Sequence, residues 1–172
     1  NALTLGATSA TGLIDVRTRT GDLTAAGNIS TLNTAANAIV LVAGETAVAG
    51  TATGGNIIIG GGGAAVSTGS GGRATLYSGS VSGSVGITAL VGSGSGNFRY
   101  NSDEVTTNYS APLGAGTYAI YREQPTLSIT ADSPSAITYG SALPALTATV
   151  AGLQNGDTLA QAFSTQATVI AG

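Results

Sequence analysis

The sequence lacks the residue types from which most enzyme active sites are built. It contains no cysteine, histidine or lysine, so disulfide bonds, thiolate catalysis, sulfur-ligated metals and the commonest general base are excluded. It also has no tryptophan or methionine and only two phenylalanines. We therefore expect a protein that is not an enzyme, with no catalytic, cofactor-binding or metal-ligating residues and a core of small aliphatic side chains.

Charged residues are scarce as well. Five arginines and eight acidic residues give a net charge of −3. Nucleic-acid binding depends on clustered cations, but Arg17 and Arg19 lie beside Asp15 and Asp22, so we expect no nucleic-acid partner. No run approaches 18 apolar residues, and no membrane span is predicted. Abundant Gly, Ser, Thr and Asn with few charges favours an exported protein.

The first part of the chain, residues 1–96, contains short apolar runs that are closed by glycine. The runs align with a spacing of 18 residues at Leu23, Leu41, Ile59 and Tyr77, and a weaker run follows at 87–91. Short strands with glycine corners at a period near 20 residues predict a β-solenoid, in which successive coils stack by parallel pairing. Helix propensity competes only within 32–38.

Residues 97–124 gather five of the eight aromatic residues: Phe98, Tyr100, Tyr109, Tyr118 and Tyr121. The pattern predicts a β-meander that caps the open solenoid end, with strands at 97–101, 105–109 and 117–122 and a linker after it. Side chains alternate between the two faces of a strand, so Phe98 and Tyr100 share a face. Tyr118 and Tyr121 fall on opposite faces, and at least one of that pair is expected in the core.

Residues 125–172 alternate between apolar and polar positions. An Asn155-Gly156 pair between two such runs is a strong hairpin signal. We expect a partial, antiparallel, Ig-like β module here. The predicted fold class is therefore all-β throughout.

The glycine clusters invite comparison with phosphate-binding loops. Gly69, Gly71 and Ala74 have the spacing G-x-G-x-x-A, but no long helix is predicted after them. A nucleotide loop also needs a lysine, which the chain lacks. Corner glycines are the favoured interpretation.

Acidic residues offer two weak sites. Glycoside hydrolysis needs two facing carboxylates, for which Asp15 with Asp22 is one candidate pair and Asp103 with Glu104 another. The competing interpretation makes Asp15 a solvated partner of Arg17, and makes Asp103 a turn former. Oxygen ligands near Asp103 and Glu104, together with Asn101, are also compatible with calcium.

Two stretches carry a resemblance to a known family. Tyr139-Gly140, Pro144 and the run 152–158 (GLQNGDT) resemble the start of the MBG, or YDG, repeat of bacterial surface proteins. Residues 71–126 resemble the segment that joins the β-helical stalk of filamentous-haemagglutinin-like adhesins to such repeats. The resemblance implies two-partner secretion, a right-handed parallel β-helix, a location outside the bacterial cell, and a chain cut from a longer protein at both ends.

Three functions remain open from the sequence. The favoured one is a structural segment of a filamentous adhesin, whose partners are neighbouring repeats or copies of the same polypeptide and a host-surface glycan or protein. A second is a fibre subunit in which one copy donates a strand from residues 1–18 to the next. A third is a glycan-binding or polysaccharide-active β-helix, with Arg17, Arg19 and Arg73 as its candidate cations.

Overall fold

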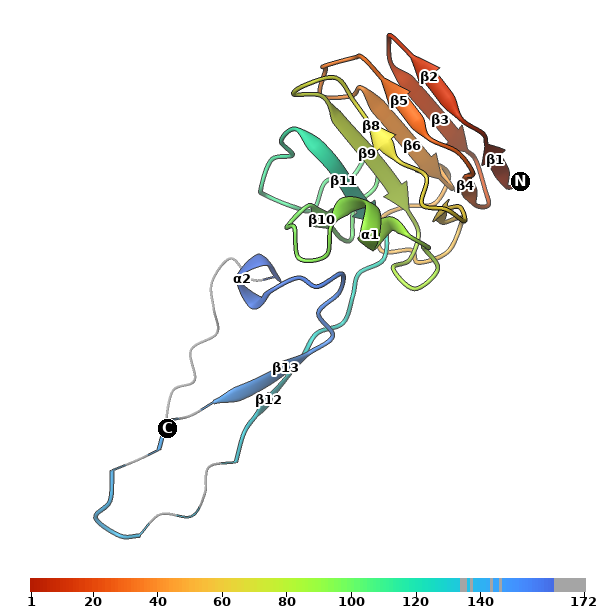
Figure 1. The fold of residues 1–172 in the computed structure, drawn as a ribbon. Coiled ribbons are helices and arrows are strands. Elements are labelled where there is room, and N and C mark those ends of the chain that lie inside the picture. Colours follow the sequence, from red (N-terminus) through yellow and green to blue (C-terminus); the bar gives the residue numbers. More distant parts are fainter. Residues whose placement is uncertain (134–135, 137, 143, 146, 163–172) are drawn as a thin grey trace.

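Short strands stack into three sheets of parallel strands (Figure 1). The computed structural model describes residues 1–133, 136, 138–142, 144–145 and 147–162. One sheet holds β1 (Leu3–Leu5), β4 (Leu23–Ala25) and β7 (Ile57–Ile59), and a second holds β2 (Thr8–Ala10), β5 (Ile29–Thr31) and β8 (Val66–Ser67). The third has the order β10 (Phe98–Arg99), β11 (Gly116–Tyr121), β9 (Arg73–Ser78), β6 (Ile39–Ala43) and β3 (Ile14–Thr18). The described chain is nearly all β with parallel sheets, which confirms the expected class.

The chain visits the three sheets in the same order three times, as β1-β2-β3, β4-β5-β6 and β7-β8-β9. Residues paired across the third sheet form a column that crosses all five of its strands. This column consists of Val16, Leu41, Leu76, Ala119 and Phe98. All five belong to or pack against the main hydrophobic cluster, so the core lies between the sheets and is built from small and medium apolar side chains.

The predicted alignment of Leu23, Leu41, Ile59 and Tyr77 at 18-residue intervals is wrong. Leu23 pairs with Leu3, 20 residues earlier (3 to 23), and with Ile57, 34 residues later (23 to 57). Leu41 lies in a different sheet, in β6. The pairing distance varies because the turns differ in length: residues 19–22 connect β3 to β4, whereas the longer loop 44–56 connects β6 to β7.

The predicted antiparallel meander at 97–124 is also wrong. β10 and β11 pair in parallel, and β11 is inserted between β9 and β10. Residues 105–109 form no strand. The Asp103 carboxylate instead accepts hydrogen bonds from the backbone N–H groups of Val105 and Thr106, and this local bonding competes with strand pairing.

A second face of the third sheet is also covered. Four side chains on it, those of Val42, Thr75, Tyr118 and Ile120, are buried although they lie outside the main hydrophobic cluster. The segment 101–115 makes contacts here, because Arg73 donates to the carbonyl oxygen of Leu113 at 2.9 Å and the N–H of Gly114 donates to the Tyr118 hydroxyl at 2.9 Å. The segment expected to cap the stack therefore partly covers its side.

The apolar run at 87–91 is a helix, α1 (Ile87–Val91), where a further solenoid run was expected. Gly86 precedes it with a φ of 74°, and the Ile87 side chain is buried against the core. The window 32–38 forms no helix. Among the described residues, neither α1 nor α2 (Leu159–Ala162) is long and apolar enough to cross a membrane.

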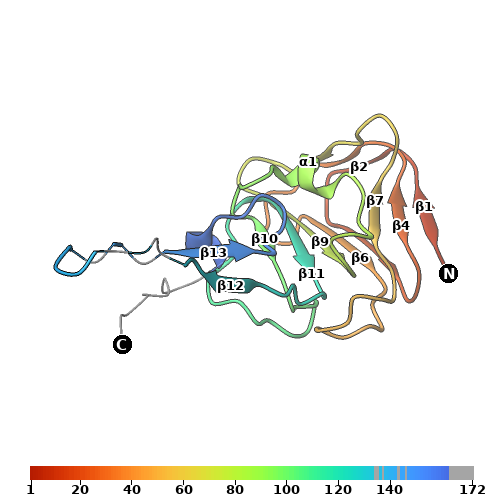
Figure 2. The same cartoon turned by 90° about the horizontal axis from the view of Figure 1, so that it is seen from below.

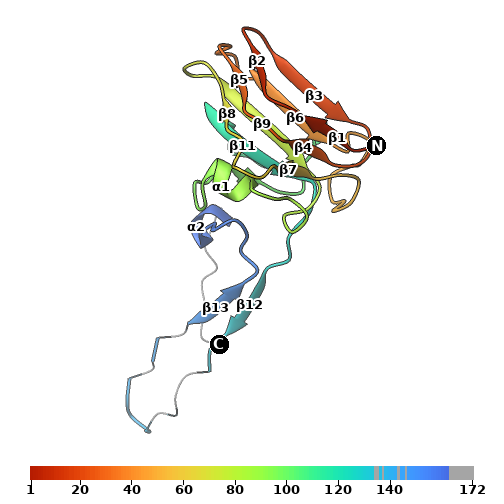
Figure 3. The same cartoon turned by 45° about the vertical axis from the view of Figure 1, so that its right-hand side comes forward.

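The last part of the chain is an antiparallel ribbon, as expected. β12 (Ser128–Ala131) pairs with β13 (Ala148–Ala151), and the ribbon projects from the end of the molecule opposite the amino terminus (Figure 2). α2 folds back toward the segment that follows α1, where Nε2 of Gln161 donates to the Gly94 carbonyl oxygen at 3.0 Å (Figure 3). The turn at Asn155-Gly156 is confirmed, with positive φ at both residues and a hydrogen bond from the Asp157 N–H to the Gln154 carbonyl, but α2 follows it and β13 pairs with the earlier strand β12, so the described residues do not form the hairpin expected at this turn. The strand expected after α2 lies outside the described residues.

Candidate functional site: the junction groove

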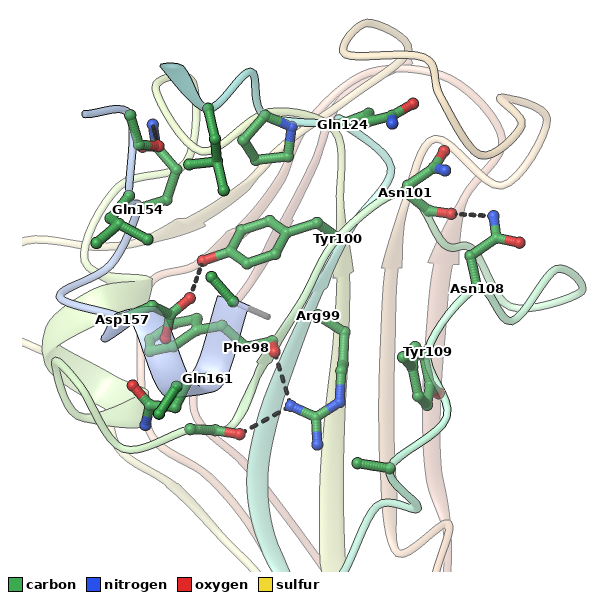
Figure 4. Close-up of a pocket in the computed structure, with 18 of the residues that line it drawn as sticks. Phe98, Arg99, Tyr100, Asn101, Asn108, Tyr109, Gln124, Gln154, Asp157 and Gln161 are labelled. Carbon is green, nitrogen blue, oxygen red and sulfur yellow. Dashed lines mark hydrogen bonds between the residues drawn. The ribbon is translucent and has the colours of Figure 1, made fainter. Parts of the chain in front are cut away.

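A groove of about 720 Å³ lies where the stacked sheets meet the carboxy-terminal ribbon (Figure 4). The edge strand β10 and the segment 108–111 form one side, and the segment 152–162 forms the other. We call it the junction groove, and its lining residues are 96, 98–101, 108–111, 124–125, 127, 152–154, 157 and 160–162.

The turn at residues 154–157, the docking turn, fixes the ribbon to the stacked sheets. The Thr88 hydroxyl donates to Oδ1 of Asn155 at 2.6 Å, and Nδ2 of Asn155 donates to the Tyr100 hydroxyl at 3.1 Å. The Asn155 carbonyl accepts the N–H of Gly94 at 2.9 Å. Asn155 can point these groups at the stacked sheets because its φ of 51° is one that asparagine tolerates better than most residues. It is buried, as expected for a docking residue.

A second contact of the docking turn joins two titratable groups. The Tyr100 hydroxyl donates to the Asp157 carboxylate at 2.6 Å (Figure 4). Burial raises the pKa of the Tyr100 hydroxyl, and the bond to Asp157 raises it further. Burial also raises the pKa of the Asp157 carboxyl, although the hydrogen bond from Tyr100 opposes that rise. The pair is therefore a partly desolvated hydrogen bond that links the ribbon to β10.

Arg99 occupies the other side of β10. Its Nη1 donates to the carbonyl oxygens of Gly96 at 2.8 Å and Phe98 at 2.7 Å. Its guanidinium carbon lies 5.4 Å from the centroid of the Tyr109 ring and 5.7 Å from that of Tyr118, which are cation–π distances. These contacts hold the only arginine of the groove lining in one orientation.

Three aromatic rings end the small-residue core at this junction. The Tyr121 ring stacks on Phe98, with centroids 6.5 Å apart, and on Tyr100, with centroids 5.8 Å apart. Phe98 and Tyr100 therefore share a face, as predicted. Tyr121 belongs to the core cluster whereas Tyr118 packs outside it against Arg99, which confirms that this pair lies on opposite faces.

Comparison with known protein families bears on the ribbon. Residues 127–172 match the MBG domain (YGX type). No curated protein and no solved structure matches the chain. The match supports a repeat domain of the adhesin-like kind in this part of the chain. The described residues within this match (127–133, 136, 138–142, 144–145 and 147–162) are hereafter the MBG segment, and its residues 152–162 supply one wall of the junction groove.

The Asp103 carboxylate, one of the possible calcium ligands, is used within the chain. Oδ2 of Asp103 accepts the N–H of Ala49 at 2.7 Å, and its other oxygen is bound by two backbone N–H groups. Burial alone would raise the pKa of the Asp103 carboxyl, but these three backbone donors outweigh it and the pKa lies below its usual value. No group of three or more His, Cys, Asp or Glu residues that could hold a metal occurs in the described parts of the chain. Asp103 is thus a turn former.

Glu104 lies near a buried cation. Burial raises the pKa of the Glu104 carboxyl. Burial lowers the pKa of the Arg122 guanidinium, which is fully buried and donates to the carbonyl oxygen of Gly55 at 2.8 Å. Arg122 therefore anchors the loop 44–56 to the end of β11, a role that no sequence pattern indicated.

The remaining predicted residues lie away from the groove. Asp15 pairs with Arg17 at 2.7 Å on the surface, as expected if Asp15 is a solvated ion-pair partner and not a catalytic acid. Arg17 also pairs with Glu45 at 3.0 Å. Asp22 accepts the N–H of Asn56 at 2.8 Å. The glycine spacing at 69–74 leads into strand β9 and not into a helix, so it does not build a phosphate loop.

Proposed function

We propose that the chain is a non-enzymatic structural segment of a bacterial extracellular adhesin of the filamentous-haemagglutinin type. In this proposal residues 3–121 wind as coils of a right-handed parallel β-solenoid and form a stiff stalk. The MBG segment begins the repeats that continue the stalk. Neighbouring repeats of the same polypeptide are then its main partners.

The supporting observation is the repeated order in which the chain visits the three sheets, followed directly by an MBG match. Successive passes are joined by main-chain hydrogen bonds in all three sheets, for example between β6 and β9. Each such bond contributes about 1 kcal/mol net to stability. Rigidity then comes from backbone pairing along the stacking axis, which does not require large side chains.

Stretching single molecules between their two ends tests this proposal. The MBG segment contains a two-stranded ribbon with largely exposed faces, so we expect it to extend first and at low force. The stacked sheets should extend last. Their roughly 120 residues would release roughly 400 Å of chain at about 3.3–3.6 Å per residue.

The substitution Leu41→Ala should lower the force at which the stacked sheets extend, because Leu41 lies in the middle of the core column. Leu32→Ala is the matched control, since Leu32 is 73% exposed. Stacked sheets that extend before the MBG segment, or without a resolvable force step, would contradict a stalk that transmits force.

A further inference from the structure

The junction groove contains polar groups that make no hydrogen bond with any described residue. Nδ2 of Asn108 bonds to the Asn101 carbonyl and Nε2 of Gln154 bonds to the Gly152 carbonyl, which leaves the amide oxygen of each without a partner among the described residues. The exposed Gln124 amide and Nη2 of Arg99 likewise make no hydrogen bond with any residue that the structure describes. The groove therefore offers both donors and acceptors, arranged around β10 (Figure 4).

The groove lining carries little net charge, which disfavours strongly ionic ligands. Arg99 and Asp157 are its two charged lining residues and they are of opposite sign. The remaining polar lining consists of amides and hydroxyls. The whole chain carries a net charge of −3, which disfavours an acidic ligand. A ligand that matches this lining is neutral and rich in hydroxyl groups.

The groove also offers an apolar surface for the flat face of such a ligand. The half-buried Tyr109 ring packs against Arg99 and lines the groove, and Pro125 and Leu127 add further apolar lining. Aromatic rings with a nearby polar rim are suited to ligands that combine apolar faces with hydrogen-bonding edges. The volume of about 720 Å³ lies within the roughly 300–1,000 Å³ typical of small-molecule sites.

We propose that the junction groove binds a short neutral oligosaccharide. Tyr109 packs against a sugar ring, while the amides of Asn108, Gln124 and Gln154 and Nη2 of Arg99 bond its hydroxyl groups. Because the two walls come from the stacked sheets and from the MBG segment, the site exists only while the docking turn is seated. The proposal does not depend on the stalk function, which the stretching experiment tests separately.

An array of neutral and acidic oligosaccharides, probed with the 172-residue chain in the presence of EDTA, tests the proposal. We expect binding to neutral members and weaker or no binding to sulfated and uronic-acid members. For the tightest neutral oligosaccharide, Tyr109→Ala should lower the affinity about tenfold, as expected when a stacking ring is lost. Tyr139→Ala is the matched control, because Tyr139 is fully exposed and does not line the groove.

A second variant distinguishes loss of sugar binding from loss of the folded structure. Gln124→Ala changes an exposed side chain without a described hydrogen bond, so it should leave the thermal unfolding of the protein unchanged and still weaken sugar binding several-fold. Absence of neutral-glycan binding by the parent chain would overturn the proposal. So would binding that survives both Tyr109→Ala and Gln124→Ala at the parent affinity, or a preference for acidic glycans.

Discussion

Substitution of a single residue in the docking turn tests how the MBG segment is held against the stacked sheets. Asn155 contributes two side-chain hydrogen bonds, with Thr88 and Tyr100, and a backbone φ of 51°. Asn155→Gly removes the two hydrogen bonds but keeps the backbone conformation accessible, because glycine adopts positive φ freely. Asn155→Ala removes the same bonds and adds backbone strain. The two variants therefore separate the side-chain contribution from the backbone contribution.

The expected magnitudes follow from these contacts. Two hydrogen bonds at about 1 kcal/mol each make docking of the MBG segment about 2 kcal/mol weaker in Asn155→Gly. This corresponds to a roughly 30-fold lower ratio of docked to undocked molecules. A left-handed conformation costs alanine roughly 1–2 kcal/mol more, so docking in Asn155→Ala should be weaker by that further amount. The bond between the Gly94 N–H and the Asn155 carbonyl can persist in both variants.

Distance measurements between spin labels provide the assay. The chain has no cysteine, so Thr11→Cys and Thr130→Cys give one label on the stacked sheets and one on β12, both at exposed positions. We expect a narrow distance distribution in the parent, a broader one in Asn155→Gly, and the broadest in Asn155→Ala. Far-ultraviolet circular dichroism should show that the stacked sheets stay folded. If Asn155→Gly kept the parent distribution, the side-chain bonds of Asn155 would not hold the junction.

Three further predictions concern stability, each measured by urea unfolding. Gly55→Ala should destabilise the protein by more than about 1 kcal/mol, because the added Cβ would clash with a backbone oxygen and Gly55 has a φ of +147°. Gly61→Ala is its control: an added Cβ there meets no atom within 4 Å, so this variant should be neutral or slightly stabilising. Asp103→Asn should cost about 1–3 kcal/mol at neutral pH. The pKa of Asp103 is lowered in the folded protein, so the carboxylate stabilises the fold above its unfolded pKa of 3.8. The difference in unfolding free energy between the parent and Asp103→Asn should therefore shrink as the pH falls below 3.8. A difference that does not change with pH would contradict this. Leu41→Ala should cost about 2–5 kcal/mol, whereas Leu32→Ala should change stability by less than about 0.5 kcal/mol.

The strand content of the stacked sheets could be predicted from the sequence because it depends on local properties. Runs such as 39–43 and 57–59 are apolar, β-branched and bounded by glycine or polar residues, and each forms a strand. The turn at Asn155-Gly156 was predicted for the same reason, whereas the pairing of β12 with β13 joins segments too far apart for such a local signal. The strands and this turn need only a few consecutive residues to be specified.

The register between strands could not be predicted, because it depends on the number of residues in each connection between strands. The loop 44–56 leaves the stack and is held by Arg122, whose partner Gly55 is 67 residues away in the sequence. A spacing rule that treats every coil as equal must fail at such a loop. The insertion of β11 between β9 and β10 is equally non-local, since it lets Ala119 pair with both Leu76 and Phe98.

The junction groove was missed because its polar contacts join distant segments. Asn155 was recognised as a turn residue, but its partners Thr88 and Tyr100 lie 67 and 55 residues earlier. Asp157 follows in the same turn and bonds the Tyr100 hydroxyl. The available signal was the excess of polar residues in a turn, Gln-Asn-Gly-Asp, that needs only the Asn-Gly pair to form.

The aromatic stack explains why the two parts of the chain meet where they do. A core of small aliphatic residues leaves apolar surface exposed at the end of the stacked sheets, and Phe98 and Tyr121 cover it with large rings. Tyr100 extends the stack by one more ring, and its hydroxyl must then find a partner because it is partly buried. Asp157 and Asn155 of the docking turn supply that partner. The residue that completes the end of the core is therefore also the residue that binds the MBG segment, so closing the stack and orienting the repeat that follows are coupled through one side chain.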